Sequence, residues 1–288
     1  DTKADTTKNG GTKFARKIVC YLYGSESYPS QVDRDGNGKA DTDENGYYIY
    51  DYDEKYALSA ELVGGSAEAD IAVLRVNRSD IDKIGGSVKA AEFADYYRVG
   101  QKAIAIGNPE SEGISVTEGI VSVDNENIVL SVDGTKRYHR SMRIDTAIYH
   151  GSSGGGLFNG DGKLIGITNA GNEDDQNINY AIPLGVVKGT VENILHYAQN
   201  GDLPVKAQKV TLGVTVGADN AKYEYDAASG FGKVTETVTV KEITAGSPAE
   251  KLGLKVGDEI TAISVSGKIY EINRNFDISD ALLTARKT

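Results

Sequence analysis

The sequence predicts an all-β fold of the sandwich or barrel type, and both the composition and the pattern of apolar runs indicate this class. Glycine (34 residues) and tyrosine (17 residues) are abundant, whereas tryptophan is absent. Short runs rich in β-branched residues recur between Gly, Asn and Asp, and helical periodicity is rare. Strands and turns spaced in this way are typical of sandwiches and barrels. The expected strands lie in 17–24, 70–76, 102–107, 119–123, 127–132 and 163–168.

Length and charge limit the classes of function. A chain of 288 residues suggests two domains, at about 150 residues per domain. The formal net charge of −11 leaves few cations to hold a phosphate backbone, so we expect no nucleic-acid partner. No apolar run approaches the ~18 residues of a membrane span. The single cysteine, Cys20, excludes an intrachain disulfide and a zinc site built from cysteines.

Local signals place one helix, two hairpins and a domain boundary. Apolar residues at helical spacing, among them Val187, Val191 and Ile194, predict a helix over 183–200. The Asp-Gly pairs at 133–134 and 161–162 lie between apolar runs and predict tight hairpins. The polar stretch 201–209 predicts a linker, so we expect a first domain over 1–203 and a second over 208–288.

The sharpest chemical feature is the segment 151–157, Gly-Ser-Ser-Gly-Gly-Gly-Leu. A serine that attacks a carbonyl needs an exposed hydroxyl and nearby amides aimed at the developing oxyanion. The glycines around Ser153 allow the N–H groups of Gly151 and Ser153 to point into one small hole. A flexible glycine-serine loop is the alternative that these residues leave open.

Further blocks surround this loop in a fixed order. Asp70 precedes the strand 71–76, Gly-Asn-Pro occupies 107–109, and Ile-Asp-Thr-Ala occupies 144–147. The segments 116–122 and 179–183 complete the set. Together these blocks resemble the HtrA (Deg) family of trypsin-like serine proteases over residues 56–200.

The resemblance implies two perpendicular six-stranded β-barrels with an active site between them. Ser153 matches the family's nucleophile, and Asp70 matches the aspartate that orients the catalytic histidine. The amides of Gly151 and Ser153 match the oxyanion hole. Ile148 matches the primary specificity pocket, which would favour small or medium aliphatic side chains, and the strand that pairs with substrate corresponds to Thr168, Asn169 and Ala170.

The general base is missing from the expected place. The sequence has three histidines, His139, His150 and His196, and all follow Asp70, whereas the family's histidine precedes its aspartate. His150 lies in the oxyanion loop and matches no base. Because Asp1 is not an initiator residue, we expect an upstream segment that carries the histidine in the parent protein. A natural pseudoprotease is the alternative, and in either case we expect this chain itself to be inactive.

Residues 33–44 fit the calcium loop of an EF-hand. Glycine stands at its sixth place, Gly36, where a sharp turn is needed. The flanks do not look helical, so the sequence predicts a lone calcium loop at a hairpin tip that braces the chain. A solvated acidic turn is the alternative. The expected ligands are Asp33, Asp35, Asn37, Lys39 through its carbonyl, Asp41 and Glu44.

The second domain carries its own signature. Ser247 is expected to cap a short helix that has Pro248 in its first turn and ends at Gly253. Residues 208–288 resemble a PDZ domain of the circularly permuted bacterial type, without its last strand. The resemblance implies that a peptide's terminal carboxylate binds the amides of Leu212, Gly213 and Val214, beside a groove helix at 278–283.

The leading functional expectation is an HtrA-type serine endopeptidase that acts on unfolded or exposed protein segments, with C-terminal peptides bound by the PDZ domain. The family implies an extracytoplasmic location, a missing N-terminal membrane anchor and a trimer in the full-length parent. No cofactor is expected for catalysis. The rival hypotheses are a non-catalytic scaffold that binds peptides or partner proteins and, on weaker grounds, a calcium-dependent structural protein.

Overall fold

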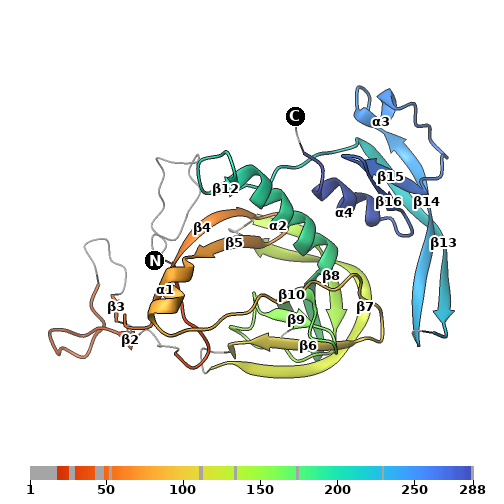
Figure 1. The fold of residues 1–288 in the computed structure, drawn as a ribbon. Coiled ribbons are helices and arrows are strands. Elements are labelled where there is room, and N and C mark those ends of the chain that lie inside the picture. The colour runs from red at the N-terminus through yellow and green to blue at the C-terminus, as the bar shows by residue number, and fades with distance from the viewer. Residues whose placement is uncertain are drawn as a thin grey trace. The chain divides into compact units, whose positions relative to one another are not determined.

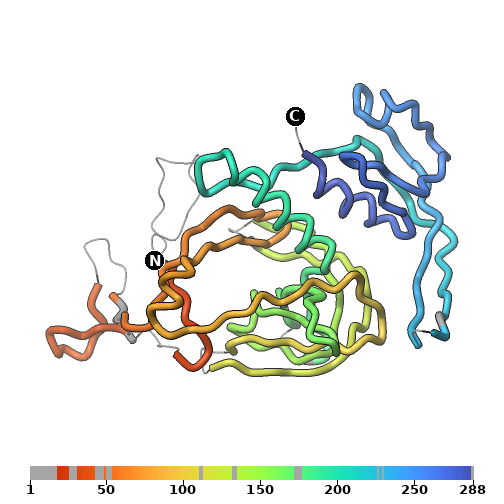
Figure 2. Tube along the Cα trace, viewed as in Figure 1, coloured from red at the N-terminus to blue at the C-terminus, as the bar shows by residue number. Residues whose placement is uncertain are grey.

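A computed structural model of the chain describes residues 18–25, 30–42, 49–51, 54–109, 113–132, 135–172, 175–228 and 230–286 (Figures 1 and 2). The chain forms two compact units. The first comprises Asp1–Leu62 and Leu74–Ala90, and the second comprises Val63–Val73 and Ala91–Thr288. No helix among the described residues is both long and apolar enough to cross a membrane.

The first unit contains short strands and one short helix. Strand β1 (Ile18–Cys20) pairs antiparallel with the start of β4 (Leu58–Ser66). Strands β2 (Ser30–Gln31) and β3 (Tyr50–Asp51) pair with each other at the base of the acidic loop. Helix α1 (Arg78–Lys83) follows β5 (Ile71–Val76), which pairs with β4.

The second unit is built around a closed six-stranded barrel in the order β10-β11-β8-β7-β6-β9. Its core is apolar, and Ala103, Val121, Met142, Leu157 and Ile165 are completely inaccessible to solvent. The barrel therefore supplies a rigid frame for the loops that leave its strands. Its strands are β6 (Lys102–Gly107), β7 (Ser115–Val132), β8 (Thr135–Ile144), β9 (Gly156–Phe158), β10 (Leu164–Asn172) and β11 (Asp175–Pro183).

Both predicted hairpins join antiparallel neighbours in the barrel. Val132 pairs with Thr135, so β7 and β8 meet around the first Asp-Gly pair, which lies outside the described residues. Strand β10 pairs back on β9 from Leu164 to Phe158, and Asn159 N–H donates a hydrogen bond to the carbonyl group of Lys163 at 2.9 Å, so the second Asp-Gly pair lies in a short connection. The predicted tight turn is confirmed, because Gly162 N–H donates to the carbonyl group of Asn159 at 3.0 Å and Gly162 has a φ of +73°. Asn159 Oδ1 also accepts hydrogen bonds from the N–H groups of Asp161 and Lys163.

The predicted helix is α2 (Leu184–Ala198). It starts after Pro183, whose extended backbone ends β11, and its buried face includes Leu184, Val187 and Ile194. The predicted linker contains β12 (Val205–Lys206), which runs parallel to β4 and pairs with Gly64 and Gly65. The linker is therefore fixed along a sheet edge.

The C-terminal part of the second unit is a small lobe of strands and two short helices. Ser247 caps α3 by accepting a hydrogen bond from Glu250 N–H, and Gly253 has a φ of +80°, so the predicted helix limits are confirmed. Strands β13 and β14 pair from Val214↔Ile243 to Asp226↔Phe231 and form a hairpin that extends well beyond β15 and β16 (Figures 1 and 2). The elements are β13 (Val214–Asp226), β14 (Phe231–Ile243), α3 (Pro248–Lys251), β15 (Ala262–Val265), β16 (Lys268–Glu271) and α4 (Asp277–Leu283).

The fold is therefore mostly β and contains one six-stranded barrel, as the sequence predicts. Elsewhere in the described part of the chain, β1, β4, β5 and β12 form a four-stranded sheet. The second barrel, the PDZ fold and the boundary between 203 and 208 stay predictions.

Candidate active site

Ser153 lies on an exposed turn between β8 and β9. Its Oγ donates a hydrogen bond to the carbonyl oxygen of Asn169 at 2.9 Å. Gly151 and Gly154 have φ values of +90° and +87°, a left-handed conformation that L side chains rarely adopt. The turn that presents Ser153 therefore depends on these two glycines.

Gly107 at the end of β6 lies directly against the Ser153 turn. A Cβ atom on Gly107 would stand 2.9 Å from Ser152 Cβ, closer than two such atoms can approach. Gly155 in turn faces the carbonyl group of Ile106. The glycines of the Gly-Asn-Pro block and of the serine loop are therefore needed for this close packing.

Asp70 immediately precedes β5 and has an exposed carboxylate and a φ of +53°. Its Oδ2 accepts a hydrogen bond from Asn169 Nδ2 at 2.8 Å. Asn169 stands at a bulge in β10, where the pairing with β11 shifts between Thr168 and Ala170. Asp70 and Ser153, which are 83 positions apart in the sequence, thus contact one and the same residue.

The remaining residues of the predicted site lie near this centre. The N–H groups of Gly151 and Ser153 find no acceptor within the described parts of the chain. Ile148 is half-buried and packs against the barrel core, and Ala170 follows the bulge in β10. Thr168 differs from the expected substrate strand, because its N–H and C=O groups already pair with Gly155 and Gly154. It therefore faces the serine loop.

The three histidines are dispersed. His139 lies within β8 and is only 3% exposed, whereas His196 is exposed in the last turn of α2. His150 is exposed and precedes Gly151. The residue that links Asp70 to Ser153 is Asn169.

The acidic loop gathers three carboxylates, of Asp33, Asp35 and Asp41, with oxygen atoms within 4.8 Å of one another. Backbone N–H groups, above all that of Gly38, lower the pKa of Asp33. Such a cluster of hard oxygen atoms can hold a metal ion. The predicted ligands Asn37 and Lys39 lie within the loop, and Asn37 Oδ1 accepts a hydrogen bond from Lys39 N–H. Glu44 lies outside the described residues.

The C-terminal lobe presents Leu212, Gly213 and Val214 at the start of β13. Gly213 has a φ of +75°, and Ser247 occupies the space that a Cβ atom would need. The carbonyl groups of Leu212 and Gly213 accept hydrogen bonds from Ala249 N–H and Thr244 N–H, each at 2.9 Å. This segment is therefore held against the start of α3.

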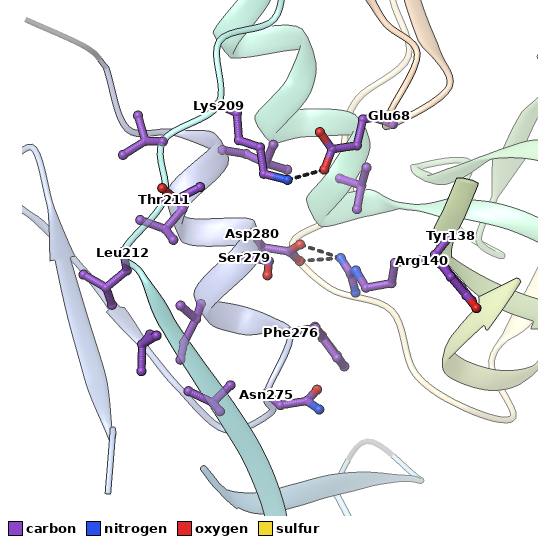
Figure 3. A pocket seen from close by; sticks show the side chains of 18 of the residues that line it. Glu68, Tyr138, Arg140, Lys209, Thr211, Leu212, Asn275, Phe276, Ser279 and Asp280 are labelled. Atoms are coloured by element: carbon purple, nitrogen blue, oxygen red, sulfur yellow. Dashed lines mark hydrogen bonds and ion pairs between the residues drawn. The ribbon is translucent and has the colours of Figure 1, made fainter. Parts of the chain in front are cut away.

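A cavity of about 640 Å³ lies beside this segment (Figure 3). Leu212 and α4 line one part of it, and Tyr138 and Arg140 from β8 line another. Arg140 Nη2 lies 2.6 Å from both carboxylate oxygens of Asp280 on α4. Burial raises the pKa of Asp280 to about 6, although the charge of Arg140 acts in the opposite direction.

The sequence does not predict the long-range contacts that hold these sites together. Asn169 was expected to pair with substrate, and its contact with Asp70 carries no local signal, since the two residues are 99 positions apart. The ion pair of Arg140 with Asp280 joins residues 140 positions apart. Phe276 lies against the guanidinium groups of Arg140 and Arg274, with distances of 4.4 and 5.0 Å to the ring centre.

Comparison with known proteins identifies the class of the chain. Residues 33–167 match the family described as trypsin-like peptidase domain. The chain therefore contains a trypsin-like peptidase domain by homology.

Within that class, the chain belongs to the HtrA/DegP-type family of serine proteases. It is 30% identical over 290 residues to "Serine protease Do-like HtrA" of Bacillus subtilis (strain 168), covering 91% of this chain and 61% of the relative. It is 35% identical over 225 residues to "Serine protease Do-like HtrB" of the same organism, covering 74% of this chain and 45% of that protein. The chain thus spans less than two thirds of the length of these relatives.

A solved structure described as "HtrA-type protease AlgW with decapeptide" is 26% identical, with a TM-score of 0.47. The match covers 83% of this chain and 67% of the other.

Proposed function

We propose that this chain is the body of an HtrA-type serine endopeptidase that cleaves unfolded or exposed protein segments. The observation that carries the proposal is the contact of Asp70 and Ser153 with the same residue, Asn169. An aspartate and a serine that contact the same residue from two sides can both bond one imidazole ring placed between them. A barrel-based peptidase domain over 1–203, with a second barrel, forms part of the proposal.

In the proposed reaction, Ser153 Oγ attacks the carbonyl carbon of a peptide bond and gives its proton to the imidazole. The C–N bond then breaks, the amine leaves with that proton, and water hydrolyses the resulting acyl-enzyme to release the carboxylic acid and free Ser153. The oxyanion is stabilised by the N–H groups of Gly151 and Ser153, which have no acceptor within the described residues. Asp70 orients the imidazole that takes the proton from Ser153. Ile148 lines a pocket for a small or medium aliphatic side chain, and the substrate backbone pairs with Asn169 and Ala170.

We propose that none of His139, His150 and His196 acts as this base, so that the chain alone hydrolyses peptides very slowly. His139 is buried in β8 and His196 lies on α2. His150 belongs to the loop that carries the oxyanion donors. The proposed site therefore needs an imidazole from outside residues 1–288.

Supplying free imidazole tests this function directly. We expect a fluorophosphonate to label Ser153 slowly in buffer and on the order of ten times faster or more with imidazole, because a positioned base contributes about 10²–10⁴ in rate. Intact-mass and peptide-mapping mass spectrometry measure the labelling. Ser153→Ala measures any labelling of other serines. Ser152→Ala is a matched substitution in the same loop, and it should still be labelled at Ser153.

The rival function, a scaffold that binds peptides without cleaving them, predicts the opposite result. Labelling of Ser153 that imidazole does not accelerate would favour the scaffold. Rapid labelling without imidazole would show instead that the chain contains its own base.

We further propose that residues 208–288 are a PDZ domain that binds the C-terminal ends of peptides. The backbone of Leu212, Gly213 and Val214 would receive the carboxylate, and the peptide would lie between β13 and α4. The cavity beside Leu212 supports this proposal. Weaker binding of a peptide with an aliphatic C-terminus after amidation of that terminus would support carboxylate recognition, and equal affinities would contradict it.

The clustered carboxylates support the proposal that the loop 33–44 binds calcium. Calorimetric titration should give a Kd on the order of 10⁻⁴–10⁻³ M, the range of extracellular modules, and calcium should raise the midpoint of thermal unfolding. Asp33→Asn should abolish the heat, whereas Asp95→Asn, an exposed aspartate of the other unit, should preserve it. No heat with the unchanged chain would contradict the proposal.

We also propose that the protein acts outside the cytoplasm and that the full-length parent protein forms a homotrimer. Relatives named as periplasmic serine endoproteases, such as "Periplasmic serine endoprotease DegP" of Escherichia coli (strain K12), support the location. A calcium loop of low affinity fits such a compartment, where calcium is plentiful.

A further inference from the structure

We propose that Thr168 is a positioning residue for the oxyanion hole and that it acts through the peptide group between Ser152 and Ser153. The inference rests on the proposed function, in which Ser153 is the nucleophile. It assigns to the Thr168 hydroxyl a role separate from pairing with substrate.

The Thr168 side chain is held inside the protein by the serine loop. Thr168 is 1% exposed, and its Oγ1 lies 2.5 Å from the carbonyl oxygen of Ser152 and 3.1 Å from that of Gly155. Because a hydroxyl has a single proton to donate, the shorter contact to Ser152 is the main hydrogen bond. The Thr168 backbone also pairs with Gly154 and Gly155 at 2.8 and 2.9 Å.

The position of the Ser152 carbonyl group determines where the N–H group of Ser153 points. The two groups belong to one planar trans peptide unit, so they point in opposite directions. Ser152 is 7% exposed and directs its carbonyl group toward buried Thr168, whereas Ser153 is exposed. The Thr168 hydroxyl thus keeps the Ser153 N–H on the exposed side of the loop.

Backbone hydrogen bonds of Gly154 and Gly155 hold the end of the turn on β10, but they do not involve the peptide group between Ser152 and Ser153. The second donor to the Ser152 carbonyl group is Gly155 N–H at 3.0 Å, which comes from within the turn. The turn also contains Gly151 and Gly154, whose backbones permit rotations that other residues resist. The hydroxyl of Thr168 is the side-chain contact that connects this peptide unit to β10.

Crystal structures of the full chain with Thr168→Val and Thr168→Ser, beside the unchanged chain, test the proposal. Valine keeps the shape of threonine without the hydroxyl, and serine keeps the hydroxyl without the methyl group. We expect the peptide unit to keep one orientation in the unchanged chain and in Thr168→Ser. In Thr168→Val we expect it to turn away or to occupy two orientations, with loss of the outward Ser153 N–H.

A single, unchanged orientation in Thr168→Val would overturn the proposal. If Thr168→Val does not fold, the structures of the unchanged chain and of Thr168→Ser are compared. The proposal is overturned if the serine hydroxyl in Thr168→Ser no longer bonds to the Ser152 carbonyl group and the peptide unit still has the orientation of the unchanged chain. The crystal structures show the orientation of the peptide unit without any reaction at Ser153. Failure of the labelling at Ser153 would therefore contradict the proposed function but would not change the outcome of this structural test.

Discussion

Asn169 joins two predicted site residues through different parts of its structure. Its side-chain amide donates to Asp70, and its backbone carbonyl group accepts from Ser153. The bulge in β10 at this position makes the double contact possible, because it breaks the regular alternation of side chains along the strand. One irregular residue thus connects a carboxylate and a hydroxyl that lie far apart in the sequence.

Gly107 offers a test of the packing under the serine loop. Gly107→Ala should lower the free energy of unfolding by about 1–3 kcal/mol, because overpacking forces neighbouring atoms to shift. The matched control is Gly160→Ala, where the nearest atom to a new Cβ is 3.7 Å away and no loss is expected. Chemical denaturation measures both variants, and equal stabilities would contradict the close contact with Ser152.

At the scale of elements, Asn193 joins helix α2 to the linker and to α4. Asn193 is completely buried, and its Nδ2 donates to the carbonyl groups of Gln208 and Leu283, each at 3.0 Å. Its Oδ1 accepts a hydrogen bond from Gln208 N–H at 2.8 Å. A single polar side chain thus satisfies backbone groups from two other segments, which fixes the end of α4 against α2.

Replacing Asn193 with alanine should therefore destabilise the fold. We expect a loss of about 1–3 kcal/mol in the free energy of unfolding, the cost of leaving buried polar groups without partners. Glu192→Ala, at the exposed neighbouring position, should change it by less than about 0.5 kcal/mol. A loss in Asn193→Ala no larger than in this control would contradict the structural role.

Helices and their ends could be predicted because their signals are local. The spacing of Val187 and Ile194 predicts α2, and Ser247 with Gly253 predicts the limits of α3. The tight turn predicted at 161–162 is confirmed, because Gly162 N–H donates to the Asn159 carbonyl group and Gly162 has a positive φ. The pattern of glycines and aspartates does not show that the Asn159 side chain also bonds to the turn.

At the scale of the whole chain, long-range contacts could not be predicted. The blocks around Asp70 and Ser153 indicated which residues belong to the site. That Asn169 stands between them depends on how β5 and β10 are placed by the fold. The ion pair between Arg140 and Asp280 likewise depends on how α4 packs, and an acidic residue in a short helix shows no sign of it.

The buried Asp280 predicts a pH dependence of stability. Its pKa rises from 3.8 to about 6 on folding, so the folded protein holds a proton that the unfolded chain releases. This stabilisation is complete below the unfolded pKa and is lost as the pH rises through the folded pKa. The free energy of unfolding should therefore fall by about 1 kcal/mol from about pH 5 to about pH 7 through this group.

Chemical denaturation of the unchanged chain and of Asp280→Asn at both pH values measures this contribution. Other groups titrate in both proteins, so the contribution of Asp280 is the difference between the two proteins in how the free energy of unfolding changes with pH. We expect the fall in the free energy of unfolding to be ~1 kcal/mol smaller in Asp280→Asn than in the unchanged chain. Identical responses would show that the carboxyl group titrates normally.

The central claim is that Asp70 and Ser153 act together on one imidazole, and the rate of labelling of Ser153 in Asp70→Asn tests it most directly. Asparagine keeps the shape of the side chain but cannot stabilise an imidazolium. We predict that imidazole accelerates the labelling of this variant by less than about twofold, so that most of the acceleration is lost. Equal acceleration in Asp70→Asn and in the unchanged chain would contradict the account.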